Sequence, residues 1–382
     1  MNKSVIFKSP SNTISGYSKI IDLFIRNFSE RPDIDFYLML EYFDSPKYSK
    51  YLKQITRDII NQSIEFVVCP LSTNNYNKNY LLNPNFNCQK YIFTMWESTN
   101  LEYGIPEKIN QTNNNVLVPS EWNRINFINN GISCPIHVVP LGINEKLFFY
   151  KPPHKKSKFV FGCGEGQNQI RKRLDYTIEC FCKAFPPKIK DVELHVKIDH
   201  RQYQDFPKYT DNRIKIIFEH LSDENMINFY ENLDVFVSLA YSEGWGLMQH
   251  ESMMCGRPVM SVNYGGIAEF FDSNVGIELQ YHEELSGGMY ASTNGFWASV
   301  IEEDVIEKFR YCYNNQNIVL NKGLLSHNKV KHLTEQNTIN HIIKIFETNI
   351  NSNSGLNILT SNIISPYNEN ITQKLVDTLT RK

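Results

Sequence analysis

The sequence predicts an α/β protein with two doubly wound, Rossmann-like domains, and three observations support this class. The chain has 382 residues, which at roughly 100–200 residues per domain is enough for two. Short apolar runs alternate with segments of helical period along most of the chain, which is typical of mostly parallel sheets. The alternation stops once, at residues 150–156, where two prolines and a run of charge predict a linker.

The first half of the chain contains the elements of one such domain. Residues 17–28 carry apolar side chains at helical spacing. Ser120 stands where the N-cap of a second helix over 121–129 is expected, with Gly131 just past its end. Short apolar runs predict strands at 5–7, 36–40, 66–69, 91–95, 116–118 and 137–139.

The second half repeats the alternation after the linker. Strands are predicted at 159–163, 194–198, 214–218, 234–239 and 259–262. Helices are predicted at about 171–185, at 223–232 with Ser222 as cap, at 247–255, at 301–314 and at 324–349. The polar tail ends with a short predicted helix at 371–380. We therefore expect one domain over residues 1–145, a second over 146–350 and a tail over 351–382.

Composition and charge exclude several classes of protein. Hydrophobic residues make up 41% and charged residues 21%, as in ordinary globular proteins. The formal net charge of -2 gives no basic excess, so we expect no nucleic-acid partner. No apolar run approaches the roughly 20 residues of a membrane span, and no secretory signal is evident. The eight cysteines form no CxxC pair, which favours free thiols in a cytoplasmic location.

The strongest chemical signal is the segment SEGWGLMQHESMMCGRP at residues 242–258. It follows a buried strand with a loop that contains Gly244 and Gly246, and a helix then begins. This arrangement presents backbone N–H groups and a helix N-terminus to an anion such as a phosphate. Glu243 and Glu251 lie in the loop and on the helix, where carboxylates can accept hydrogen bonds from sugar hydroxyls. The competing interpretation is a surface loop with two solvated acids.

These residues resemble the E-x7-E motif of the retaining glycosyltransferases of family 4, with Ser252 and Met254 in place of alanines. The resemblance implies the GT-B fold, in which two Rossmann-like domains face each other across a cleft, and a last helix that crosses back to the first domain. It also implies that Glu243 lies near the donor-sugar hydroxyls and that Glu251 binds the ribose of the donor. The expected donor-binding segment includes Gly244, Trp245, Gly246 and Leu247.

The start of the second domain, residues 159–185, is similar to the part of this family that binds the donor diphosphate. Lys172 falls on the family's lysine, whereas the family's arginine falls on Gln167, so Arg171 or Arg173 could replace it. Two cations there would neutralise charge on the leaving group. The alternative is a solvated first turn, although cations at a helix N-terminus are unfavourable without a bound anion. Gly16 lies in the loop that approaches the diphosphate or acceptor in the family, or in a simple turn.

Three residues are candidates for the acceptor side. Trp96 and Glu97 stand near the point where many family members place a histidine that faces the acceptor. Trp96 could stack on a sugar or belong to the core, and Glu97 could bind acceptor hydroxyls. Ser120, in a second stretch that matches the family at 116–148, could contact the ligand or act only as a cap. The turn Gly265–Glu269 is expected to be structural.

The resemblance implies a metal-independent transfer of a sugar, with retention, from a nucleotide-diphosphate sugar to a glycan, protein or small-molecule acceptor. No cofactor is expected. The Asp33-Ile34-Asp35 spacing is interpreted as a loop, and the ten histidines form no metal-binding pattern, so no metal site is predicted. The alternatives are a nucleotide-sugar epimerase or a phosphorylase on the same fold, and a non-catalytic nucleotide-sugar-binding protein. A dinucleotide oxidoreductase is disfavoured because the first loop lacks G-x-G-x-x-G.

Overall fold

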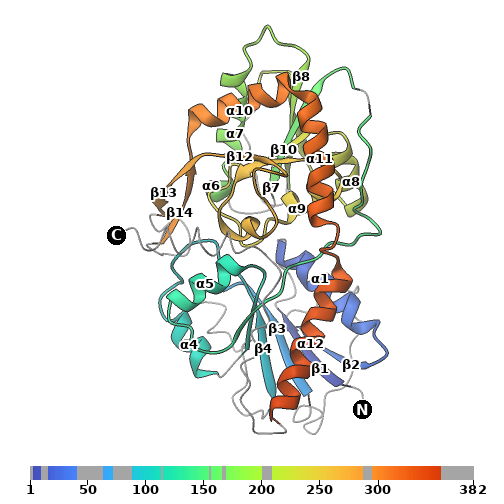
Figure 1. The fold of residues 1–382 in the computed structure, drawn as a ribbon, viewed down its shortest axis with the longest axis vertical. Coiled ribbons are helices and arrows are strands. Elements are labelled where there is room, and N and C mark those ends of the chain that lie inside the picture. Colours follow the sequence, from blue (N-terminus) through green and yellow to red (C-terminus); the bar gives the residue numbers. More distant parts are fainter. Residues whose placement is uncertain are drawn as a thin grey trace. The chain divides into compact units, whose positions relative to one another are not determined.

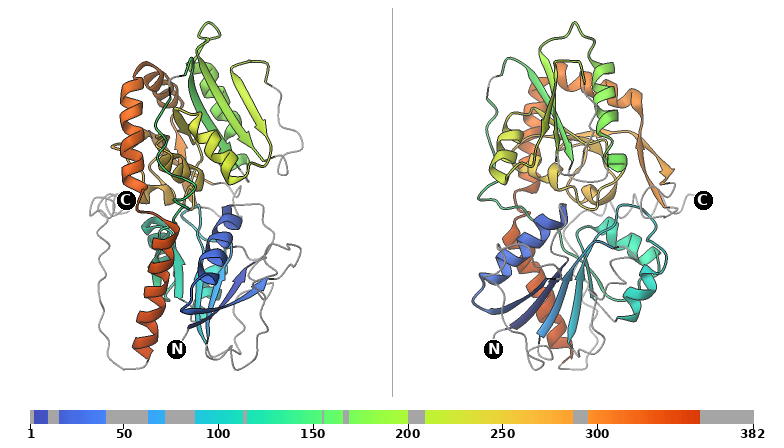
Figure 2. Two further views of the ribbon diagram at one scale, coloured as in Figure 1. Left: turned by 90° about the vertical axis from the view of Figure 1, so that its right-hand side faces the viewer. Right: turned by 180° about the vertical axis from the view of Figure 1, so that it is seen from behind.

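The computed structural model describes residues 3–9, 16–40, 63–71, 88–112, 115–154, 156–165, 169–199, 209–286 and 295–353. Its larger compact unit, residues 1–342, contains two separate six-stranded parallel sheets flanked by helices (Figures 1 and 2). The two-domain α/β class is therefore confirmed.

The first sheet has the strand order β2-β1-β3-β4-β5-β6. All of its neighbouring strands are parallel. The strands are β1 (Lys3–Ser9), β2 (Ile34–Leu40), β3 (Ser63–Val68), β4 (Gln89–Phe93), β5 (Asn115–Val118) and β6 (Ile136–Val138). Each of the six strands predicted for this half is confirmed to within a few residues. Ile34 and Asp35 belong to β2, so only Asp33 of that acidic pair lies in the preceding loop.

The described residues of the first half form the helices α1 (Gly16–Ser29), α4 (Ile105–Gln111) and α5 (Glu121–Asn129). Phe24 of α1 packs on the rings of Phe66 and Phe93, with centroid distances of 5.1 and 5.3 Å, so the amphipathic face of this helix covers the sheet. The Ser120 cap is confirmed, because its hydroxyl accepts from the Asn123 backbone N–H at 3.2 Å. Helix α4 was not predicted, since it is short and buries only Ile105 and Ile109.

The second sheet has the order β12-β11-β10-β7-β8-β9 and is also parallel throughout. Its strands are β7 (Phe159–Glu165), β8 (Val192–Ile198), β9 (Ile214–Phe218), β10 (Val235–Val237), β11 (Val259–Val262) and β12 (Ile277–Leu279). The helices are α6 (Gln169–Lys172), α7 (Leu174–Ala184), α8 (Asp223–Glu231), α9 (Leu247–Met254), the 3₁₀ helix η2 (Gly265–Glu269), α10 (Glu302–Asn314), α11 (Gln316–Val330) and α12 (Glu335–Asn353). An antiparallel hairpin, β13 (Tyr281–Leu285) and β14 (Phe296–Val300), was not predicted.

Two of the predicted helices are wrong as continuous elements. The helix expected at 171–185 is divided into α6 and α7 by Arg173, whose φ of 56° is left-handed. The helix expected at 324–349 is divided between α11 and α12 by residues 331–334. There Thr334 forms a parallel bridge with Ile143, and its hydroxyl accepts from the Asn337 backbone N–H at 3.2 Å. Both breaks depend on contacts with remote parts of the chain, which helical period does not reveal.

The boundary expected after residue 145 falls between β6 and β7, and the helix expected at 371–380 lies outside the described residues, as does most of the predicted tail. These two expectations stay predictions. In the part of the chain that is described, no helix combines the length and the apolarity that a membrane crossing requires.

The loops that contain Gly244 and Gly266 are in tight contact, and this contact can be tested by substitution. A Cβ at Gly266 would overlap the backbone carbonyl group of Gly244, which cannot turn away as a side chain can. We expect Gly266→Ala to lower the free energy of unfolding by about 2–4 kcal/mol in urea titrations. Gly16→Ala is the control, because its Cβ would lie 3.3 Å from the flexible end of Leu247. Equal losses in both variants would contradict the packing.

Candidate active site

The topology of the second sheet brings two loops together. β7 and β10 are neighbours, and the chain leaves them toward opposite edges, to β8 and to β11. Ligands of open α/β sheets bind beyond the carboxyl ends of strands at such a point. The segment after β7 carries Arg171 and Lys172, and the segment after β10 carries Glu243. The fold itself therefore places the two predicted parts of the donor site side by side.

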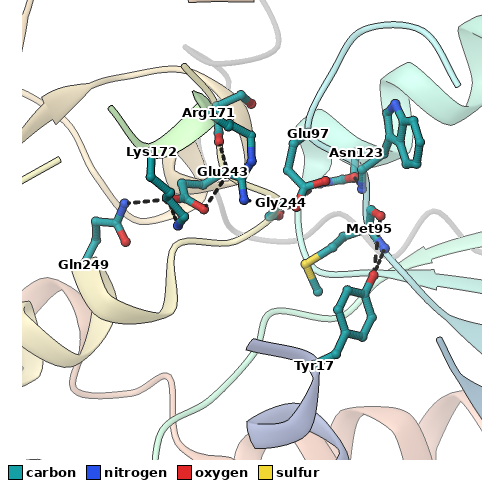
Figure 3. Close-up of polar contacts among 11 residues, drawn as sticks. Tyr17, Met95, Glu97, Asn123, Arg171, Lys172, Glu243, Gly244 and Gln249 are labelled. Atoms are coloured by element: carbon teal, nitrogen blue, oxygen red, sulfur yellow. Dashed lines mark hydrogen bonds and ion pairs between the residues drawn. The ribbon is translucent and has the colours of Figure 1, made fainter. Parts of the chain in front are cut away.

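Glu243 is the centre of a buried cluster of charges (Figure 3). The residue is 7% exposed, and its Oε2 accepts from Arg171 Nη1 at 3.0 Å. Lys172 Nζ pairs with the other carboxylate oxygen, Oε1, which also accepts from Gln249 Nε2 at 3.3 Å. Both carboxylate oxygens of Glu243 therefore have partners, which come from α6 and α9. Gln249 was missed by the sequence, because six positions from Glu243 is no recognised spacing.

The charge of Glu243 is held by its two cations. Burial alone would raise the pKa of this carboxyl group, but the charges of Lys172 and Arg171 outweigh burial and lower the pKa to about 2. Glu243 is consequently ionised at neutral pH and is a weak base. It is suited to accept hydrogen bonds and not to remove a proton.

The two cations differ in what else they hold. Arg171 also donates to the Ser242 carbonyl group, and its Nη2 lies 3.7 Å from Glu97 Oε1. It therefore joins Glu243 to the acceptor-side candidate Glu97. Lys172 is half-buried, and within the part of the chain that the structure describes its ammonium group pairs with Glu243 alone. Of the two cations, Lys172 is the freer to engage an anionic ligand.

The loop of Glu243 is fixed by contacts from the first half of the chain. Asn123 Nδ2 donates to the Gly244 carbonyl group at 3.1 Å and to Ser120 Oγ at 3.0 Å, and Asn123 Oδ1 accepts from the Trp96 backbone N–H at 2.8 Å. A Cβ at Gly244 would lie 2.6 Å from Met95 Cγ, so only glycine fits this approach. Ser120 is fully buried and acts as a cap and a spacer, so its capping interpretation is the one supported.

The second acid of the motif, Glu251, is also paired. Its Oε2 accepts from the Tyr230 hydroxyl group at 2.8 Å, and its Oε1 lies 2.5 Å from Lys19 Nζ on α1. Lys19 Nζ is 3.4 Å from Asp223 as well. The roles of Tyr230, Lys19 and Asp223 were missed by the sequence. The signal that could have found Lys19 is the one used for Arg171 and Lys172, a cation in the first turn of a helix.

A pocket of about 140 Å³ adjoins Glu251. Its lining includes the ion-paired side chains of Lys19 and Glu251, together with Leu247 and Asp223. Gly16 begins α1, and Leu247 begins α9 directly after Gly246, whose φ is 94°. Because a Cβ at Gly16 would lie 3.3 Å from Leu247 Cδ1, the N-termini of α1 and α9 meet beside this pocket.

Both tryptophans among the predicted site residues are buried in cores. Trp96 is 2% exposed and its indole N–H donates to the Asn100 carbonyl group at 2.7 Å. Trp245 is 1% exposed and packs on Phe270 with ring centroids 4.9 Å apart. The core interpretation of Trp96 is the supported one, and any donor contact at Trp245 would come from its backbone.

The remaining expectations from the sequence concern Gln167, a metal site and the Gly265–Glu269 turn. Gln167 lies outside the described residues. Within the ranges that are described, no three His, Cys, Asp or Glu side chains gather in a group that could hold a metal ion. The Gly265–Glu269 turn is structural as expected, because the Gly266 N–H donates to the Glu243 carbonyl group at 2.6 Å and Glu269 accepts from the Glu121 N–H at 2.9 Å.

The chain is similar to known glycosyltransferases in sequence and in structure. Residues 208–284, which include Glu243 and Glu251, match the family model of the glycosyl transferases group 1, so the resemblance to this group is confirmed. No curated protein sequence matches the chain significantly.

Solved structures share its fold. Sucrose-phosphate synthase from Thermosynechococcus elongatus has a TM-score of 0.65 at 12% identity, covering 92% of this chain and 100% of that one. The lipopolysaccharide outer core galactosyltransferase WaaB has a TM-score of 0.60 at 14% identity, covering 89% and 99%. TarM has a TM-score of 0.54 at 17% identity, covering 78% of this chain and only 57% of TarM. A variant of S. aureus TarM has been solved with UDP and alpha-GlcNAc-glycerol. These likenesses establish the GT-B fold.

The pairing of Glu243 predicts how stability depends on pH. Because its folded pKa lies below the ordinary value of 4.5, its contribution is present above pH 4.5 and is lost as pH falls toward about 2. We expect Glu243→Gln to cost about 3 kcal/mol at neutral pH, since buried Arg171 and half-buried Lys172 both lose their anionic partner. The difference from wild type should shrink as pH falls to about 3, as measured by denaturant unfolding. Exposed Glu303→Gln serves as the control, and a difference that is constant with pH would count against the pairing.

The contact between Lys19 and Glu251 predicts an energetic coupling between α1 and α9. Lys19 is 43% exposed on its side chain, so solvent screening limits the coupling to about 1 kcal/mol. A double-mutant cycle with Lys19→Met and Glu251→Gln should show this value at low salt and less at high salt. The surface pair of Lys158 and Glu193, 2.7 Å apart, is the control and should couple more weakly. Independent effects of the two substitutions at low salt would refute the contact.

Proposed function

We propose that the chain is a glycosyltransferase that moves a sugar from a nucleotide-diphosphate sugar to an acceptor hydroxyl group. Transfer with retention of anomeric configuration and without a metal is part of the proposal. The observation that carries it is the ion cluster of Glu243 with Arg171 and Lys172 at the switch point of the second GT-B sheet, in which Glu243 lies within the group 1 match. The same proposal includes a cytoplasmic location, supported by eight cysteines that are all free thiols.

The donor would bind along the second sheet. Glu251 would take the ribose hydroxyls, in exchange for its contact with Lys19. The diphosphate would lie against Lys172 and the N-termini of α1 and α9, where backbone N–H groups and helix dipoles favour an anion. Glu243 would accept hydrogen bonds from the sugar hydroxyls, as an ionised carboxylate with a pKa of about 2 can do.

In the reaction, the bond between the anomeric carbon and the donor phosphate oxygen breaks, and a bond from the acceptor oxygen forms. Lys172 and the helix N-termini stabilise the charge that develops on the leaving diphosphate. Glu243 is too weak a base to take the acceptor proton, so that proton passes to the leaving phosphate oxygen. The acceptor would lie on the side of Glu97, whose link to Arg171 connects the acceptor and donor sides.

The experiment that tests this function begins with ligand binding. Purified protein is screened against a panel of nucleotide sugars for a rise in melting temperature, since a ligand that binds the folded state raises it. The stabilising donor is then incubated with and without candidate acceptors, and the products are followed by NMR. Transfer with the α or β configuration preserved and unaffected by EDTA supports the proposal. Epimer formed without acceptor supports the epimerase alternative, and binding without turnover supports the non-catalytic one.

Lys172→Ala is the decisive substitution. Loss of the charge opposite the leaving diphosphate should lower the turnover number per folded molecule about 10²–10³-fold, and the melting temperature should fall as well, because Glu243 loses one of its two cationic partners. Lys183→Ala, on the exposed face of α7, is the matched control and should change turnover less than about twofold. Wild-type turnover in Lys172→Ala would show that the diphosphate site has been assigned to the wrong residue.

A further inference from the structure

Arg173 has a conformation that calls for an explanation. Among the described residues it is the one non-glycine residue with a positive φ, 56°, and it separates α6 from α7. A side chain in this left-handed region is unfavourable for an arginine, so other contacts must hold it there. The break has a direct consequence for the site, because Arg171 and Lys172 immediately precede it and both reach Glu243.

The guanidinium group of Arg173 lies over two aromatic rings. Its Cζ lies 4.0 Å from the ring centroid of Tyr176 on α7 and 4.4 Å from that of Tyr241. Each of these cation–π contacts is favourable. Tyr241 directly precedes the Ser242–Glu243 loop, and its backbone N–H donates to the Arg171 carbonyl group at 3.0 Å. One tyrosine therefore fixes the cationic segment through both its backbone and its ring.

Trp297 of β14 completes the stack. Its ring is parallel to that of Tyr241, with centroids 4.4 Å apart and an interplanar angle of 5°, and it is fully buried. The Ala298 N–H donates to the Tyr241 carbonyl group at 2.9 Å, which pins the hairpin to the same residue. The hairpin of β13 and β14 thus packs against Tyr241, the residue that holds the segment with Arg171 and Lys172.

The hairpin also contacts the acceptor side. The Phe296 carbonyl group accepts from the Thr99 N–H at 3.2 Å, and the Phe296 N–H donates to Thr99 Oγ1 at 2.8 Å. Thr99 lies two residues after Glu97, which itself pairs with Arg171. These contacts link Glu97 to Arg171, Arg171 to Tyr241, and Tyr241 to the hairpin. The hairpin in turn contacts Thr99, which is close to Glu97 in the sequence.

We propose that Arg173 is a positioning residue of the transfer reaction, held by Tyr176, Tyr241 and Trp297 so that Lys172 and Arg171 face Glu243 and the donor diphosphate. This inference rests on the proposed function and goes beyond it, because among the described residues Glu243 pairs with Arg171 and Lys172 and not with Arg173. The stack sets where the cations stand, and the hairpin ties that position to the acceptor-side loop. A group that is displaced by about 1 Å from its productive place can cost about 10²-fold in rate.

The test uses the full chain and separates position from stability. Arg173→Gly permits the left-handed backbone but removes the stack, and Trp297→Leu removes its outer layer. We expect the turnover number to fall about 10- to 100-fold in both, with donor KM changed less than about threefold and the melting temperature of Arg173→Gly close to wild type. Trp297→Phe should recover most of the turnover. Arg310→Ala is the control, since Arg310 binds the carbonyl groups of Lys183 and Ala184 at the other end of α7.

The outcomes distinguish this inference from the proposed function. If wild type transfers sugar while Arg173→Gly and Trp297→Leu keep turnover within about twofold, the positioning role is overturned and the function stands. Loss of melting temperature with unchanged turnover per folded molecule assigns the stack to stability and also overturns it. If wild type is neither stabilised by UDP, GDP or ADP nor able to consume any nucleotide sugar, the proposed function fails and this inference fails with it.

Discussion

The buried carboxylate of Glu243 is the constraint on which the site depends. An ionised group that is 7% exposed must be compensated, because an unpaired charge in the protein interior costs several kcal/mol. The compensation comes from Arg171 and Lys172, which follow a different strand of the same sheet. The left-handed break at Arg173, the aromatic stack behind it and the hairpin that carries Trp297 all serve the placement of these two cations.

The loop that carries Glu243 is confined by backbone as much as by charge. Gly244 accommodates Met95, Gly266 donates to the Glu243 carbonyl group, and Asn123 reaches from the first half of the chain to the Gly244 carbonyl group. A hydrogen bond therefore joins Asn123 to Gly244, although the two residues are 121 positions apart in the chain. Glu251 repeats this arrangement through Lys19, so both acids of the motif are held by residues that lie far away in the chain.

Much of this arrangement could be predicted because it follows from local chemistry. Apolar period located most of the described strands and helices, and the caps Ser120 and Ser222 were identified from residue type and position alone. The prediction was wrong where a remote contact competes with a local preference. Arg173 interrupts a helix whose period continues through it, and α12 begins only after Thr334, because that residue pairs with Ile143. Nothing in the sequence around Trp96 and Trp245 distinguishes a tryptophan that is buried in a core from one that faces a sugar.

By itself, the sequence determined the class of fold, the two acids and two glycines of the 242–258 segment, and the presence of a cation at Lys172. These are properties of residue type and spacing, which neighbours along the chain define. The tertiary structure alone decided that Arg171 joins Glu243 to Glu97, that Lys19 and Tyr230 hold Glu251, and that Arg173 turns away into an aromatic stack. The physical reason is that the pairing of a buried charge depends on which loops meet at the carboxyl ends of parallel strands, and strand order is set by the packing of the whole sheet.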